Sequence, residues 1–220
     1  MITYDDIRHN PDVRALIEAG NHALGVLGFT DHGYAHVGLT SNITGNILEQ
    51  LGYDPRTCEL GRIAGYMHDI GNAINRSNHA LSGALLAFDI LRKLDMDIAE
   101  VTAVITAIGN HDEHTAAAVT PISAALILAD KSDVRRSRVR TSPDSPAFDI
   151  HDRVNYAVVD ASLTVARERK RITLCLRIDT GICAVMDYFE IFLPRMTLCR
   201  SAAAHLGLDF ELIINETRML

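Results

Sequence analysis

Apolar residues recur at helical spacing through most of the first 140 residues, and glycine, proline or aspartate stands at the breaks. In the segment that begins at Tyr34, for example, Ile43, Ile47 and Leu51 fall on one face, and Gly52 follows them. The same pattern predicts helices over residues 11–25, 34–51, 58–67, 79–94, 98–108 and 121–130. The first part of the chain is therefore expected to be a mainly helical core.

The pattern changes after Arg140, where a loop containing Pro143 and Pro146 marks a candidate boundary. We expect residues 1–140 to form the helical core. Residues 141–220 are expected to form a small α+β extension packed on that core.

Within the extension, residues 161–167 and 171–178 are β-prone and are separated by a charged turn, which predicts a β-hairpin. A helix is expected over about 181–206. Residues 209–214 alternate between apolar and polar side chains, as in a strand. The extension should therefore combine a helix with a hairpin and a further strand.

Composition places the chain among ordinary globular proteins, since 48% of its 220 residues are hydrophobic and 22% are charged. Its 28 acidic and 21 basic residues give a net charge of −7, which disfavours nucleic acid or an anionic membrane surface as a partner. No apolar run reaches the roughly 18–20 residues of a membrane-spanning helix, and the N-terminal residues lack a signal-peptide pattern. The four cysteines are widely spaced without a Cys-x-x-Cys pair. We expect a cytoplasmic protein with reduced thiols.

Histidine is the unusual component, because six of the ten histidines lie between residues 32 and 114. One of them, His68, stands beside Asp69 at the end of an apolar helix, and Gly71 is expected to close that helix in a left-handed conformation. A buried carboxylate is costly unless it has a compensating partner. A metal ion and a salt bridge are both candidate partners for Asp69.

Four metal-capable residues each interrupt an apolar helical face: His36, His68, Asp69 and Asp130. Three helices could bring these two imidazoles and two carboxylates to one point. Such a mixed set of nitrogen and oxygen ligands suits iron, manganese, zinc or nickel. The alternative is an ordinary buried network of ion pairs, which is the better interpretation of any one of the four residues taken alone.

The order of these residues resembles the HD superfamily of metal-dependent phosphohydrolases over roughly residues 30–138. The match consists of an upstream histidine, the segment Met-His-Asp-Ile-Gly and a downstream Ala-Asp-Lys. The resemblance implies a mainly α fold, with an HD-type core of about six to seven helices and a metal at its centre. It carries the ligand role onto four residues: His36, His68, Asp69 and Asp130.

Two further segments resemble the binuclear branch of this superfamily, His-Ala-Leu-Ser-Gly-Ala from His79 and Asn-His-Asp-Glu around His111. Carried over, His79 and His111 would bind a second ion, and Asp69 would bridge the two ions. The cyclic-dinucleotide phosphodiesterase branch has lysine where this chain has Asn72, and its Gly-Tyr-Pro signature is missing here. Hydrolysis of cyclic-di-GMP is therefore not expected.

The resemblance implies a hydrolase that uses one or two divalent transition-metal ions, with metal-bound hydroxide as the nucleophile. The substrate would be a phosphomonoester or phosphodiester of a small molecule, and a nucleotide is the favoured class. Asp69 would hold or bridge the ions, and Asp133 could orient a ligand or a water. His32 is a candidate substrate contact. The candidates for binding the phosphate are the basic residues after Asp130: Lys131, Arg135, Arg136 and Arg138.

Two other classes of function stay open. The same superfamily includes di-iron oxygenases, with which a binuclear site would also be compatible. A non-catalytic module that binds a nucleotide or a metal is the other alternative. The C-terminal extension could form a homodimer contact or could cover the pocket, and the sequence does not choose between these roles.

Overall fold

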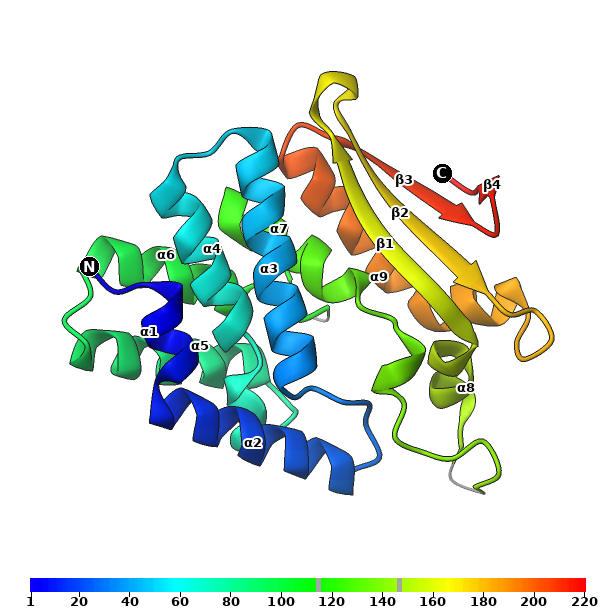
Figure 1. The fold of residues 1–220 in the computed structure, drawn as a ribbon, viewed down its shortest axis with the longest axis horizontal. Coiled ribbons are helices and arrows are strands. Elements are labelled where there is room, and N and C mark those ends of the chain that lie inside the picture. The colour runs from blue at the N-terminus through cyan, green and yellow to red at the C-terminus, as the bar shows by residue number, and fades with distance from the viewer. Residues whose placement is uncertain (114–115, 146–147) are drawn as a thin grey trace.

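The computed structural model of the protein describes residues 1–113, 116–145 and 148–220. Its helical core lies on one side of the molecule in Figure 1, and a small sheet with its own long helix lies on the other. The α-helices of the core are α1 (Tyr4–His9), α2 (Pro11–Val26), α3 (Tyr34–Leu51), α4 (Pro55–Met67), α5 (His79–Lys93), α6 (Ile98–Gly109) and α7 (Pro121–Ser132). Two short 3₁₀ helices accompany them, η1 (Ile70–Ala73) and η2 (Arg136–Arg138).

The six helices expected from the apolar pattern correspond to α2–α7, and α3 has the predicted bounds. The short helix α1 was not predicted. It begins with a capping box in which the Thr3 hydroxyl accepts from the Asp6 backbone and the Asp6 carboxylate accepts from the Thr3 backbone. A helix of six residues shows too little apolar periodicity to be recognised.

Helix α7 runs through the centre of the core, and every residue from Ile122 to Ala129 is buried. Thr120 caps its first turn together with Ser123, and Pro121 occupies the first helical position, where its missing N–H costs nothing. A helix that is apolar all round must be covered on all sides. Asp130, at the end of this buried run, is therefore carried into the interior.

Two glycines of α4 let α3 and α4 approach each other closely. A Cβ atom at Gly65 would lie 2.6 Å from the Cα atom of Ser41, and one at Gly61 would lie 2.6 Å from a methyl carbon of Leu48. Real Cβ atoms essentially never come this close to another heavy atom. The contact brings His36 of α3 beside His68 at the end of α4.

The prediction for Gly71 is wrong. The chain continues from α4 into η1 without a left-handed residue at this position. Gly71 is needed for space instead, because a Cβ atom there would lie 2.5 Å from the Gly83 backbone nitrogen and still closer to the His79 carbonyl oxygen. The start of α5 therefore packs directly against η1.

Asn78 occupies the N-cap position of α5 in a left-handed conformation (φ 60°), and its side chain accepts no helix N–H. Left-handed backbone is more accessible to asparagine than to most residues, so Asn78 serves the turn into the helix. His79 lies in the first turn of α5, as expected.

The C-terminal part contains the predicted hairpin, helix and strand. Its strand order is β1-β2-β3-β4, in which β2 and β3 are parallel and the other two pairs are antiparallel. The connection from β2 to β3 passes through α9, which packs against α7 and so joins the two parts of the molecule. The elements are α8 (Ile150–Ala157), β1 (Val158–Ala166), η3 (Arg167–Arg169), β2 (Arg171–Ile178), α9 (Val185–His205), β3 (Asp209–Ile214) and β4 (Thr217–Arg218).

The structure confirms the expected fold class, a mainly α core with a small C-terminal α+β unit that contains a β-hairpin. Helix α8 was not anticipated, although Asp149 is a good N-cap and accepts from the Asp152 backbone N–H. Within the described parts of the chain, none of the helices has the length and apolarity needed to cross a bilayer.

Candidate metal centre

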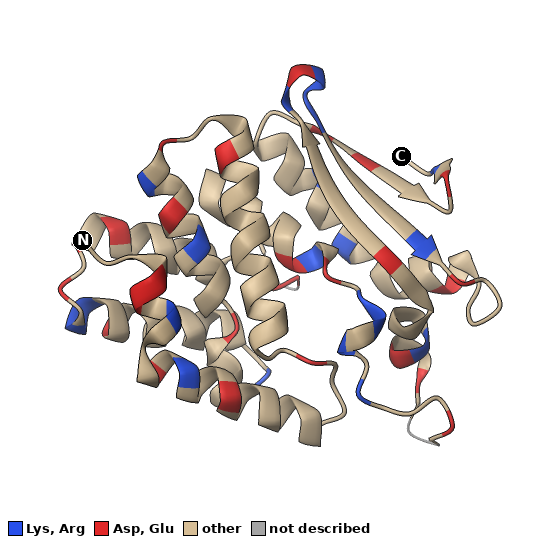
Figure 2. Ribbon diagram, in the orientation of Figure 1, with Lys and Arg blue, Asp and Glu red and all other residues tan. Residues whose placement is uncertain are grey.

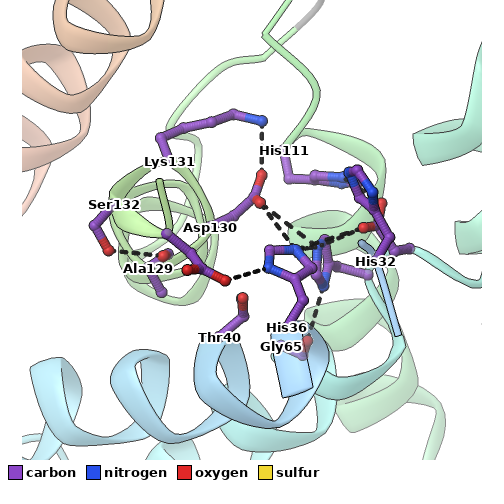
Figure 3. A network of polar contacts seen from close by, with 12 residues as sticks. His32, His36, Thr40, Gly65, His111, Ala129, Asp130, Lys131 and Ser132 are labelled. Carbon is purple, nitrogen blue, oxygen red and sulfur yellow. Dashed lines mark hydrogen bonds and ion pairs between the residues drawn. The ribbon is translucent and has the colours of Figure 1, made fainter. Parts of the chain in front are cut away.

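Four side chains from three helices and one helix junction meet at the centre of the core. His36 comes from α3, His68 is the C-cap of α4, Asp69 is the first residue beyond it, and Asp130 lies on α7. The His36 Nε2 atom lies 3.3 Å from His68 Nε2, 3.6 Å from Asp69 Oδ2 and 3.3 Å from Asp130 Oδ1. The His68 Nε2 atom lies 3.2 Å from Asp69 Oδ2 and 3.7 Å from Asp130 Oδ1. Figure 3 shows Asp130 directed at the imidazoles.

These spacings fit a shared metal ion. Nitrogen and oxygen ligands lie about 2.0–2.2 Å from a transition metal, so neighbouring ligands of one ion lie roughly 3–3.6 Å apart. The five separations given above run from 3.2 to 3.7 Å. The four residues predicted as ligands of the first metal are thus brought together at coordination spacing.

A second group faces the other oxygen of Asp69. The His79 Nε2 atom lies 3.4 Å and the His111 Nε2 atom 3.8 Å from Asp69 Oδ1, and the two nitrogens are 3.2 Å apart. Because Oδ2 faces His36 and His68 while Oδ1 faces His79 and His111, the Asp69 carboxylate spans the two groups. This is the arrangement expected of a bridging carboxylate.

The hydrogen bonds of the imidazoles fix where their lone pairs point. The Nδ1 atoms of His68, His79 and His111 lie 2.8, 3.0 and 2.6 Å from backbone carbonyl oxygens. A carbonyl oxygen can only accept, so each Nδ1 carries the proton and each Nε2 presents a lone pair to the centre. Lone pairs 3.2–3.3 Å apart repel each other unless a cation lies between them. The centre is therefore built to attract a cation.

His36 is held by a carboxylate instead. Its Nδ1 atom donates to Asp133 Oδ2 at 2.8 Å, and the Asp133 side chain is fully buried. Histidine ligands of metals commonly donate their other N–H to a carboxylate, which fixes the ring and raises its basicity. Asp133 thus orients His36, one of the two roles considered for it, and it is not among the residues that line the cavity.

Charge at the centre is strongly polarised. The pKa of Asp69 lies well below its ordinary value although burial raises it. Burial likewise raises the pKa of Asp130, but the Lys131 ammonium outweighs burial and holds that pKa well below the ordinary range. Both carboxylates are therefore available as anionic ligands. Burial lowers the pKa of His79 to about 4, which keeps this imidazole neutral.

The centre opens into a cavity of about 660 Å³, which lies within the range of small-molecule sites. His32 and Lys131, both predicted to contact substrate, line this cavity. Burial and Arg138 hold the pKa of His32 well below its ordinary value, and its Nδ1 atom lies 2.7 Å from the Thr30 carbonyl oxygen. Neutral His32 therefore presents an accepting Nε2. Lys131 Nζ donates to Asp130 Oδ2 at 2.6 Å (Figure 3).

Figure 2 shows several basic residues along the chain that follows α7, but they do not share one role. Arg135, predicted to bind substrate, is absent from the cavity lining and instead holds Asp133 through bonds of 2.6 and 3.0 Å. Arg138 does line the cavity. Arg135 precedes η2 and Arg138 ends it. The turn of the chain through η2 therefore gives the two arginines different neighbours.

The C-terminal unit supplies the cavity wall opposite the core, through Asp152 and Asn155 of α8 and Phe192 and Arg195 of α9. None of these residues was predicted from the sequence. The only available signal was the Asp149 N-cap, which marks the start of α8 but says nothing about where the helix packs. Of the six histidines clustered between residues 32 and 114, His114 lies outside the described residues.

Comparison with known proteins gives limited matches. No family model matches the chain. An uncharacterized protein from Methanocaldococcus jannaschii is 28% identical, and the match covers 67% of this chain but only 65% of that protein's length. A crystal structure described as a predicted HD superfamily hydrolase, from an uncultured Thermotogales bacterium, is similar at 22% identity. That similarity has a TM-score of 0.43 and covers 58% of this chain and 71% of the other.

Proposed function

We propose that the protein is a metal-dependent phosphohydrolase of the HD type that acts on a small phosphorylated molecule, with a nucleotide as the favoured class. One observation carries the proposal most directly. The Nε2 lone pairs of His36 and His68 face each other at 3.3 Å, those of His79 and His111 at 3.2 Å, and Asp69 lies between the two pairs. This donor set has the spacing and chemistry of a two-ion centre.

The protein's residues have distinct tasks in this reaction. His36, His68 and Asp130 would hold one ion, His79 and His111 the other, and Asp69 both. Bound there, a divalent ion supplies an acidified water and offsets the charge that develops on a phosphoryl group. The expected metals are iron, manganese, zinc or nickel, in one or two equivalents.

Lys131 and His32 act on the substrate side of the centre. Lys131 is 8% exposed as a residue, and its ammonium lies beside Asp130 at the cavity wall, where it can contact a phosphate oxygen. His32 can accept a hydrogen bond from a water or a substrate hydroxyl through Nε2, because its Nδ1–H is committed to Thr30.

The test is turnover by protein purified without chelator and reconstituted with each candidate metal. The panel contains nucleoside 5′-monophosphates and a generic aryl phosphodiester, with phosphate or phenolate release as the readout. We expect metal-dependent hydrolysis that falls by roughly two orders of magnitude or more in Asp69→Asn. Asp160→Asn is the matched control, since Asp160 is exposed on β1.

Folded, metal-loaded protein that releases neither phosphate nor phenolate would contradict the proposal. Dioxygen consumption without either product would also contradict it, in favour of an oxygenase. A third contradictory result is a variant Asp69→Asn that loses metal and melting temperature while the wild type has no turnover to lose. That result would assign the site a structural or purely binding role.

A further inference from the structure

The cavity extends from the metal centre to helix α8 of the C-terminal unit. Asp69, His79 and Lys131 line the cavity at the metal centre, and Asp152 and Asn155 line the same cavity from α8. In the proposed reaction, the residues that face the metal centre contact the phosphate group of the substrate. The α8 residues line the same cavity without belonging to the metal centre, so they are placed to contact another part of the bound substrate.

Asp152 is a buried carboxylate whose side chain has no partner among the residues that the structure describes. Only 5% of the residue is exposed, and its backbone N–H donates to Asp149 Oδ1 at 2.9 Å. Its side chain makes no hydrogen bond or ion pair with any residue in the described part of the chain. Among the described residues, the side-chain atoms that are fully buried and lack a hydrogen-bond partner do not include the Asp152 oxygens. These oxygens therefore remain in contact with solvent. A carboxylate that faces the cavity in this way is free to accept hydrogen bonds from a ligand.

Asn155 presents a second acceptor from the same helix face. Its Nδ2 atom donates to the His151 carbonyl oxygen at 2.8 Å, which leaves Oδ1 as the free end of the amide. The residue is 8% exposed and lines the cavity. Positions three apart on a helix lie side by side, so the Asp152 carboxylate and the Asn155 carbonyl form an adjacent pair of acceptors.

Two other charged pairs at this cavity satisfy each other. Glu113 accepts from Arg195 Nε at 2.7 Å, and Lys131 pairs with Asp130 at 2.6 Å. A purely structural role for Asp152 as an acidic residue near a helix N-terminus does not require burial in a cavity wall. The N-cap function itself belongs to Asp149, whose side chain accepts from the helix.

We infer that Asp152 and Asn155 form the recognition site for the non-phosphate end of the substrate, and that this end carries paired hydrogen-bond donors. The inference rests on the proposed phosphohydrolase function. A carboxylate beside an amide oxygen matches either the vicinal hydroxyls of a ribose or the amino edge of a nucleobase. Both ligands belong to phosphorylated molecules of nucleotide type, and an aryl phosphate without such donors would not use the pair.

The experiment compares wild type, Asp152→Asn, Asn155→Ala and the control Asp160→Asn on AMP, GMP, IMP, 2′,3′-dideoxy-AMP, ribose 5-phosphate and phenyl phosphate. Asp152→Asn keeps the size of the side chain, and melting temperatures check folding. We expect KM for the donor-bearing substrates to rise about 10–100-fold in Asp152→Asn, in line with a lost hydrogen bond to a charged group. KM for phenyl phosphate should not change in Asp152→Asn. KM for each of these substrates should not change in the control Asp160→Asn.

Two comparisons separate the sources of the donors. A wild-type preference for AMP over dideoxy-AMP that disappears in Asp152→Asn assigns the pair to the ribose. A preference for GMP over IMP that disappears assigns it to the base. Unchanged selectivity in both Asp152→Asn and Asn155→Ala overturns the inference.

If no phosphate ester is hydrolysed, the proposed function is refuted but the recognition site is still testable. The test is then calorimetric measurement of adenosine and guanosine binding. Weaker nucleoside binding by 10-fold or more in Asp152→Asn supports the recognition site. Equal affinity in wild type and variant, or no binding to the wild type, overturns it.

Discussion

The replacement Gly71→Ala tests how the two halves of the metal centre are held together. A Cβ atom at this position would lie 2.5 Å from the Gly83 nitrogen, whereas ordinary contacts begin near 3.4 Å. The start of α5 must therefore move away from η1 by about 1 Å. His79 is the first residue of α5 and moves with it, while His36, His68 and Asp130 belong to other elements.

The expected consequence is selective. Overpacking of this kind costs about 1–3 kcal/mol, which lowers Tm by roughly 2–12 °C for a chain of this size. A displacement of about 1 Å at a catalytic ligand can reduce turnover by about 100-fold. We expect the variant to lose the ion held by His79 and His111 and to retain the other.

The assay is metal content per chain, with Tm and turnover measured on the same preparation. Gly38→Ala is the matched control, because a Cβ atom at Gly38 meets nothing within 4 Å and alanine favours the interior of α3. The control should be as stable as the wild type or more stable. Full metal content and unchanged Tm in Gly71→Ala would refute this explanation of the glycine.

Two further predictions concern single contacts. Asp133→Asn keeps an acceptor for the His36 ring but removes the negative charge of that acceptor. The metal affinity of the site that contains His36 should therefore fall about 10–100-fold, measured by competition titration with a chromophoric chelator. Unchanged affinity would contradict the orienting role of Asp133. Arg56 donates to Glu100 at 2.5 and 2.7 Å and holds the pKa of Glu100 below its ordinary value, so this pair stabilises the fold above about pH 4.3 and the contribution fades as pH falls further. Glu100→Gln should therefore cost at most about 1 kcal/mol at pH 7 and nothing at low pH in denaturant melts, and a constant difference across pH would contradict the linkage.

The helices were predictable where sequence carries local signals. Apolar periodicity and the Gly52 stop are sufficient for α3, and the β-prone segments around a charged turn are sufficient for the hairpin. The role of Gly71 was not predictable in the same way. A glycine after a helix favours a left-handed cap on local grounds, whereas the need for space here arises from α5, which follows later in the chain.

The same distinction applies to the site. The metal-capable residues could be selected because each one interrupts an apolar pattern that is visible in the sequence. Asp152 and Asn155 lie on a short helix whose packing depends on α9 and η2, and no local signal marks them. Arg135 and Arg138 look equivalent in sequence, and only the turn at η2 places Arg138 at the cavity.

The central claim is that Asp69 joins two separate metal sites, and metal stoichiometry tests it most directly. Elemental analysis of protein purified without chelator should give two ions per chain for the wild type and one for the double variant His79→Ala/His111→Ala. At most one ion in the wild type, with no change in the double variant, would contradict the claim.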